Sequence, residues 1–262
     1  MPMGDFCPQW RKCKHMANWN DPRPSQTGFG ASPSLSGAYG RGDVFDAGLR
    51  RYMLSIYNYM ASGVLLSGIV ALVFATSGMA AAVFGTPLRW VVALAPLAFV
   101  MVMSFGINKI STGTLKALFW AFSVAMGLSL SSIFFVYTGA SIAATFFATA
   151  GAFAGLSLFG YTTRKSLSGM GTFLIMGLFG LIIASVINLF LASPGLAWGI
   201  SFLGVLIFAG LTAYDTQRLK EQYAYVAGTA MAEKVVVMGA LTLYLDFINM
   251  FTSLLQLMGD RR

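Results

Sequence analysis

Two aspartates inside long apolar stretches are the residues of this sequence best placed to do chemistry. Of the nine acidic residues, seven lie near the polar ends of the chain or in its last polar loop. The other two are Asp215, within LTAYDTQRLK, and Asp246, within LTLYLDFINMF. A charged group at membrane depth costs about 2.5–3.5 kcal/mol on insertion scales, and residues kept at that cost mark functional sites by default. No Lys or Arg is expected at membrane depth to neutralise them, so this pair is the strongest functional signal in the chain.

Two carboxyl groups within hydrogen-bonding reach can share one proton, and they then titrate as a coupled unit. Loss of that proton leaves two like charges in a poorly hydrated site, where their repulsion can separate two helices. We therefore interpret Asp215 and Asp246 as a pH sensor and gate. The alternative is that both acids only hold two helices together through hydrogen bonds.

A stripe of polar residues follows each aspartate on its own helix face. Residues at i+3, i+7 and i+10 from Asp246 lie on one side of a helix, and they are Asn249, Ser253 and Gln256. Thr212 lies three residues before Asp215. Calcium takes about six to eight oxygen ligands in a tight site, so two carboxylates with a few of these groups and waters predict weak, transient calcium binding. Such binding suits conduction, and the stripe is the predicted pore lining.

Seven apolar stretches must position these residues. The chain of 262 residues is 57% hydrophobic and 10% charged, which excludes a soluble globular protein. Apolar runs of about 20 residues are long enough to span a bilayer as helices, and their continuous pattern differs from the alternation of a membrane barrel. We predict an all-α polytopic membrane protein with spans at 54–76, 88–108, 117–137, 140–160, 170–191, 197–219 and 236–258.

The two aspartates fall on consecutive, antiparallel spans. With a turn at about 221–235, Asp215 lies six residues before the turn and Asp246 lies eleven residues after it. At 1.5 Å per residue the two depths are about 9 and 16 Å, a mismatch within the range of an uncertain loop and helix tilt. A facing pair is therefore predicted.

The distribution of the positive charges predicts the topology. The net charge is +8, and fourteen of the 17 Lys and Arg residues lie in the N-terminal tail or flank the loops 109–116, 161–169 and 220–235. The positive-inside rule places these segments in the cytoplasm, and this explains the charge without a nucleic-acid partner. Arg261 and Arg262 fit less well, because seven crossings put them outside; a last segment that re-enters and returns is the alternative.

The N-terminal tail, 1–48, is rich in Gly, Ser and Pro, lacks periodicity and is predicted to be a disordered cytoplasmic segment before a membrane domain at 49–262. Cys7, Cys13 and His15 are too few ligands for a closed metal site, so neither a metal nor a cofactor is expected there. No apolar core of a signal peptide is found in residues 1–50.

The C-terminal segments GLTAYDTQRLK and GALTLYLDFINMFTSLLQLMG resemble the hallmark of the transmembrane Bax inhibitor motif family. The central segment 128–171 is similar to bacterial members of that family, and the resemblance covers 52–262. It implies seven helices with the last one central, in the bacterial inner membrane. It also implies a pH-sensitive calcium leak controlled by aspartates that match Asp215 and Asp246. Some members latch one aspartate with a basic residue of the second helix, where this chain has only Arg89 and Lys109 at the helix ends.

Two other functions use the same features. Intramembrane aspartyl proteases carry two aspartates on adjacent helices, but their Gly-x-Gly-Asp motif is absent, because Leu243, Tyr244 and Leu245 precede Asp246. An enzyme is therefore not expected. The remaining alternative is a non-conducting regulator that binds a membrane protease or another membrane protein through its tail and the loop at 220–235.

Overall fold

The computed structural model describes the backbone of residues 35–262 and the side chains of residues 45–262, except the side chain of Ala81. Cys7, Cys13, His15 and most of the predicted tail lie outside the described residues. The first helix, α1, spans Leu35–Thr76.

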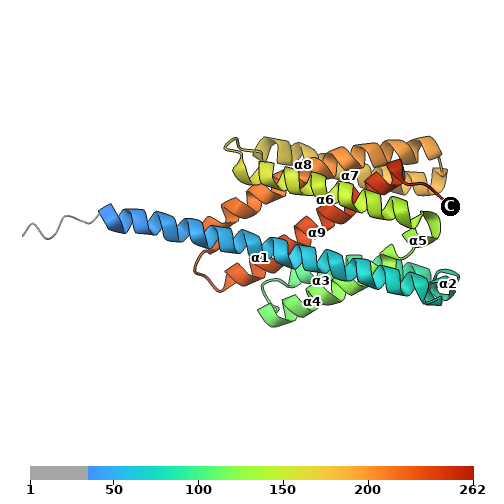
Figure 1. The fold of residues 1–262 in the computed structure, drawn as a ribbon, viewed down its shortest axis with the longest axis horizontal. Helices are drawn as coiled ribbons and strands as arrows, with labels where there is room; N and C mark the ends of the chain where they lie inside the picture. Colours follow the sequence, from blue (N-terminus) through green and yellow to red (C-terminus); the bar gives the residue numbers. More distant parts are fainter. Residues whose placement is uncertain (1–34) are drawn as a thin grey trace, which may run out of the picture. The chain divides into compact units, whose positions relative to one another are not determined.

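Long helices make up the rest of the described chain (Figure 1). Seven of the helical segments described are long and apolar enough to cross a membrane, which confirms the predicted all-α polytopic fold. The third of these spans joins α4 with the short α5, and α2 is a short helix between the first two spans. After α1, the helices are α2 (Met79–Phe84), α3 (Leu88–Gly106), α4 (Thr112–Leu130), α5 (Ile133–Val136), α6 (Gly139–Thr162), α7 (Ser168–Leu191), α8 (Pro194–Val226) and α9 (Met231–Met258).

The last helix, α9, is the central one. In its most apolar stretch 61% of the residues are buried, against 6–33% in the other six spans. It packs against α8, α6 and α4, and Figure 1 shows it crossing between the other helices. A helix with polar residues on one face has a higher cost of exposure to lipid than a wholly apolar helix, so burial of α9 follows from its sequence.

The connection between α8 and α9 is shorter than the sequence indicated. Helix α8 continues to Val226 and α9 begins at Met231, so most of the predicted loop at 220–235 is helical. Gly228 has a φ of 74°, a left-handed conformation that glycine adopts without strain and that lets the chain reverse here. A partly helical loop was expected from the sequence, and its helical part is the larger one because both helices continue beyond the point where they leave the apolar layer.

The C-terminus lies at the end of the bundle opposite the α8–α9 turn (Figure 1). Helix α9 is continuous, and the residues after it pair with the connection between α5 and α6. The N–H of Thr138 donates to the carbonyl of Asp260 at 3.1 Å, and the N–H of Arg262 donates to the carbonyl of Val136 at 3.0 Å. The structure therefore has a complete seventh span in place of a re-entrant end.

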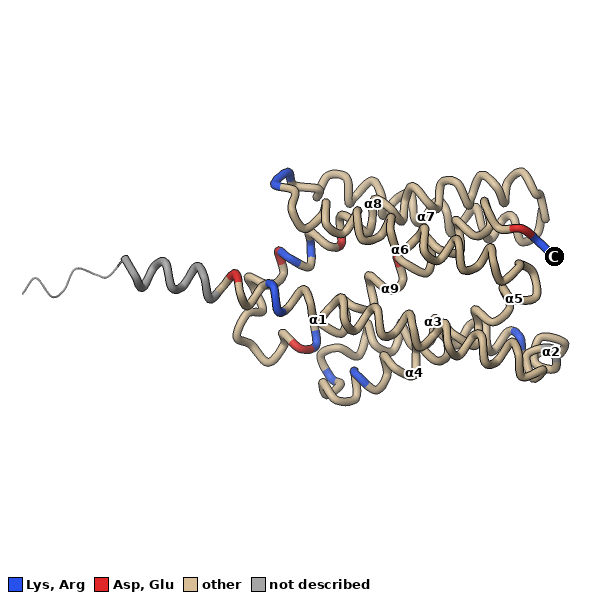
Figure 2. The backbone as a smooth tube through the Cα atoms, in the orientation of Figure 1, with Lys and Arg blue, Asp and Glu red and all other residues tan. Residues whose placement is uncertain are grey.

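Lys and Arg gather at the ends of the helices, and the middle of the bundle lacks them (Figure 2). At the end that holds the α8–α9 turn, Lys116 forms an ion pair with Glu233 at 2.9 Å, and Lys234 donates to the carbonyl of Ile107 at 3.0 Å. These contacts join the start of α9 to the start of α4 and to the α3–α4 connection, on the side predicted to be cytoplasmic.

The predicted orientation can be tested by cysteine labelling in a variant without Cys7 and Cys13. Ser166→Cys and Thr229→Cys are expected to react with a membrane-impermeant maleimide only after the membrane is opened, because the positive-inside rule places both turns in the cytoplasm. Ser77→Cys, in the connection between the first two spans, is expected to react in intact cells. Labelling of Ser166→Cys from outside an intact cell would reverse the orientation.

Gly160 allows α6 to approach α8 very closely beside Asp215. A Cβ at Gly160 would collide with the backbone carbonyl of Ala213, which a side-chain rotation cannot relieve. Gly160→Ala is therefore expected to lower the free energy of unfolding by about 1–3 kcal/mol, the usual cost of overpacking. Gly151→Ala on the same helix is the matched control, since nothing lies within 4 Å of its Cβ position. The midpoint of thermal unfolding in detergent is measured for both variants. Equal midpoints for Gly160→Ala and Gly151→Ala would contradict the close approach of α6 to α8.

Candidate functional site

The two aspartates face each other between α8 and α9. Asp215 is 8% exposed and Asp246 is 5% exposed, and their carboxyl groups lie within hydrogen-bonding reach of each other. Within the described part of the chain, no N–H or O–H group donates a hydrogen bond to Oδ2 of Asp246. Ionised carboxylates only accept hydrogen bonds, so a bond between these two groups requires one proton. The arrangement can hold one proton between two helices.

Few charges act on this pair. Arg218 follows Asp215 by three residues on α8, is exposed, and attracts its carboxylate electrostatically. The middle of the described bundle otherwise lacks Lys and Arg (Figure 2). Arg89 lies at the start of α3, with its guanidinium 5.6 Å from the ring centroid of Trp90. A basic latch from the middle of the second span is therefore not part of this site.

The polar stripe on α9 faces α8 over part of its length. A Cβ on Gly204 would lie 2.7 Å from Oγ of Ser253, so this serine packs directly on the backbone of α8. One turn further, Ser201 donates a hydrogen bond of 2.7 Å to Oε1 of Gln256, although Gln256 is an exposed residue overall. These contacts and the aspartate pair form a polar seam along the α8–α9 interface, defined by Ser201, Asp215, Asp246, Ser253 and Gln256.

Two other residues of the predicted pore lining bond to their own helices. Thr212 is fully buried, and its hydroxyl donates to the carbonyl of Phe208 at 2.8 Å. Asn249 is partly buried, and its amide donates to the carbonyl of Leu245 at 2.8 Å. The side-chain carbonyl of Asn249 and the lone pairs of the threonine hydroxyl can still accept a hydrogen bond or bind a cation.

The two residues after Asp215 have roles that the sequence did not reveal. Thr216 is fully buried and shares a hydrogen bond of 3.1 Å with Ser157 of α6. Gln217 accepts a hydrogen bond from the N–H of Leu167 at 2.8 Å and donates one to the carbonyl of Lys165 at 2.9 Å. Consecutive side chains on a helix point about 100° apart, so the segment Asp-Thr-Gln contacts α9, α6 and the α6–α7 loop in turn.

Tyr244 forms a second buried polar contact of α9 that sequence reasoning missed. Its ring is fully buried, and its hydroxyl lies 2.6 Å from Oγ of Ser67 on α1. Ser67 in turn donates to the carbonyl of Ser123 on α4 at 2.7 Å. Since Tyr244 and Asp246 are two residues apart, they point to opposite sides of α9. A tyrosine within an apolar helix was the available signal, because a buried hydroxyl needs a partner.

No group of three or more His, Cys, Asp or Glu side chains in the described part of the chain could hold a metal ion. Two carboxylates alone leave most positions around a calcium ion to neutral oxygens and water.

Comparisons with known proteins agree with this fold. A family model described as "Inhibitor of apoptosis-promoting Bax1" matches residues 49–262. The chain is 46% identical over 220 residues to the inner membrane protein YbhL of Escherichia coli, covering 82% of this chain and 94% of YbhL. It is 49% identical over 230 residues to an uncharacterized protein of Caulobacter vibrioides, covering 83% and 91%. It is 43% identical over 221 residues to the uncharacterized protein RP147 of Rickettsia prowazekii, covering 84% and 93%. The chain therefore belongs to the Bax inhibitor-1 like family of integral membrane proteins.

Proposed function

We propose that this protein is a pH-sensitive calcium leak of the inner membrane, in which Asp215 and Asp246 are both the proton sensor and the gate. The observation that supports it most strongly is the burial of two carboxyl groups against each other, between the central helix and its neighbour. The proposal includes no catalytic residue and no cofactor.

Loss of the shared proton supplies the energy for opening. Two unit charges 4 Å apart repel by about 4 kcal/mol at an effective dielectric constant of 20. Because each 1.36 kcal/mol changes an equilibrium tenfold, this repulsion can shift the ratio of open to closed states by about 10³. On the other side of α9, the hydroxyl of Tyr244 bonds to Ser67 of α1, and Ser67 bonds in turn to the carbonyl of Ser123 of α4. The movement we propose is therefore a separation of α8 from α9.

The same deprotonation prepares the path for a divalent cation. Once the helices separate, the carboxylates of Asp215 and Asp246 become a negative lining, and Thr212, Asn249 and Ser253 supply further oxygens close by. Ser201 and Gln256 extend the polar seam toward the end of α8 opposite the α8–α9 turn. Binding by this set with waters is weak enough for an ion to leave, as conduction requires.

Flux into liposomes tests the proposal. The purified protein is reconstituted into liposomes that contain a calcium-sensitive dye, and calcium entry is measured over a range of pH against protein-free liposomes. A pH-dependent entry that requires the protein is expected. No entry at any pH would exclude a leak, and copurification of a membrane protein in fixed ratio would then support the regulator alternative.

A further inference from the structure

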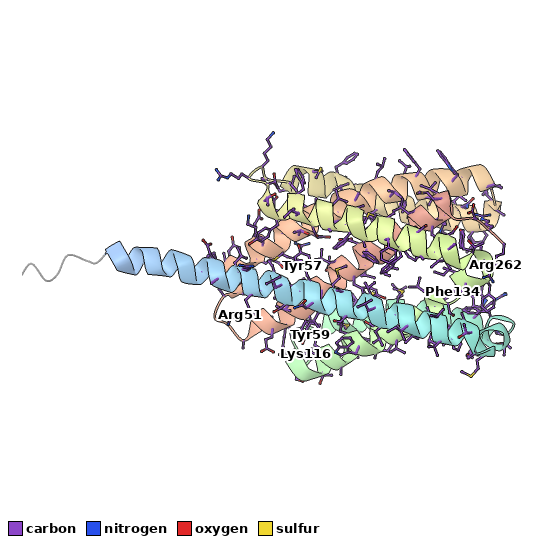
Figure 3. All side chains as sticks on the ribbon, in the orientation of Figure 1. Arg51, Tyr57, Tyr59, Lys116, Phe134 and Arg262 are labelled. Carbon is purple, nitrogen blue, oxygen red and sulfur yellow. The ribbon has the colours of Figure 1, made fainter. Side chains whose placement is uncertain are left out.

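A cavity of about 680 Å³ lies between α1 and α6, with Phe247 of α9 at its floor. Both helices belong to membrane spans, so the cavity lies at the depth of the lipid chains. Figure 3 shows Tyr57 on the side of α1 that faces α6. We call this cavity the α1–α6 groove. Its walls are made by Arg50, Met53, Leu54, Tyr57, Met60, Ala61, Val64 and Leu65 of α1 and by Phe146, Ala150, Phe153, Ala154, Ser157, Leu158 and Tyr161 of α6.

Polar groups gather at one end of the groove. Helices α1 and α6 run in opposite directions, so Arg50, near the start of the first span, lies at the same end as Tyr161, near the end of α6. Lys220 lies beside Tyr161 outside the lining: its Nζ donates to the carbonyl of Tyr161 at 2.8 Å and is 5.2 Å from the ring centroid. Deeper in the wall, Ser157 is already bonded to Thr216, and the remaining lining is apolar.

The dimensions of the groove match one leaflet of a bilayer. From Arg50 to Leu65 the wall of α1 rises by about 22 Å at 1.5 Å per residue. One leaflet contributes about 15 Å of hydrocarbon, half of a core of about 30 Å. With Arg50 at the level of the headgroups, the apolar part of the wall therefore extends through the whole depth of that leaflet.

From this geometry we infer that the α1–α6 groove binds an anionic phospholipid, with its phosphate at Arg50 and one acyl chain against Phe247. A volume of about 680 Å³ lies in the range of small-molecule sites. A transmembrane helix of another protein is the alternative occupant, because Ala150 and Ala154 are small residues four apart on α6, and the crosslinks described below distinguish it from a lipid. The inference does not depend on ion conduction.

The test uses phosphatidylglycerol with a photoreactive diazirine in its acyl chain, mixed into liposomes that contain the full chain. After irradiation, peptides are mapped by mass spectrometry. Adducts on α1 and α6 are expected to exceed those on the lipid-facing surface of α7. Arg50→Gln is expected to lower groove adducts of phosphatidylglycerol by about fivefold, the factor contributed by one basic residue near an anionic headgroup. Adducts of the matching phosphatidylcholine are expected to stay unchanged.

Two variants fill the groove from opposite walls: Ala154→Trp from α6 and Ala61→Leu from α1. Both are expected to lower adducts of either lipid on α1 and α6, with the adducts on α7 unchanged. Ala93→Trp, on an exposed position of α3, is the control for adding a large side chain to the lipid-facing surface. Equal adduct density on α1, α6 and α7, or adducts that neither filling variant reduces, would overturn the inference. Crosslinks from the groove to a second protein would do the same, since they assign the groove to a protein partner.

Discussion

Replacement of either aspartate by asparagine is expected to abolish the pH dependence of calcium flux, and the double variant is expected to behave like a single one. Asp215 and Asp246 hold one proton between them in the proposed closed state, so removal of either carboxyl group removes the whole titrating unit. Groups that act as one unit show strongly non-additive effects. The pH dependence of the flux reaches about 10³-fold for a repulsion near 4 kcal/mol. It should therefore disappear completely in either single variant.

The measurement is a double-mutant cycle of calcium entry into dye-loaded liposomes, with Asp215→Asn, Asp246→Asn and both together. Glu221→Gln is the matched control, because Glu221 is an exposed acid six residues further along α8. It is expected to keep the pH dependence of the unaltered protein. If the effects of the two single replacements add, the aspartates titrate independently and the shared proton is not the gate.

Calcium flux is expected to rise as pH rises. The closed state binds the shared proton and the open state does not, so a higher pH favours the state that binds fewer protons. The released carboxylates also attract the divalent cation, which adds to the rise. At low pH, protonation removes that attraction and keeps the hydrogen bond between α8 and α9.

This direction is measured in the same liposomes, with equal calcium gradients and with internal and external pH changed together. A flux that increases steadily as pH falls would contradict the proposed sign and would mean that protonation itself opens the path.

The sequence by itself predicted that the two aspartates are neighbours, because that prediction depends on two local properties of the chain. Apolar length and the placement of charges are properties of short segments, and they locate spans without knowledge of packing. Consecutive spans joined by a short turn are adjacent, so acids at similar depth can meet. The structure brings Asp215 and Asp246 within hydrogen-bonding reach, and it also places Ser253 and Gln256 of the predicted stripe against α8.

The residues at which helices end were harder to predict from the sequence. The sixth span was predicted to end at residue 219, whereas α8 continues to Val226. The end of an apolar stretch marks the edge of the bilayer, and the backbone hydrogen bonds of a helix can continue into water beyond it. The sequence also left a re-entrant C-terminus open, because Arg261 and Arg262 are positive. The pairing of this terminus with the α5–α6 connection, on the far side from the α8–α9 turn, is a contact between distant segments.

What only the tertiary structure decided is which neighbour each helix face meets. The partners of Gln217 in the α6–α7 loop, the contact of Tyr244 with Ser67 and the α1–α6 groove all join segments that are far apart in the chain. A helix pattern shows that a face is polar or apolar, but the same face can contact several neighbours or lipid. The sequence therefore determined the spans and their charged residues, and long-range packing determined the contacts those residues make.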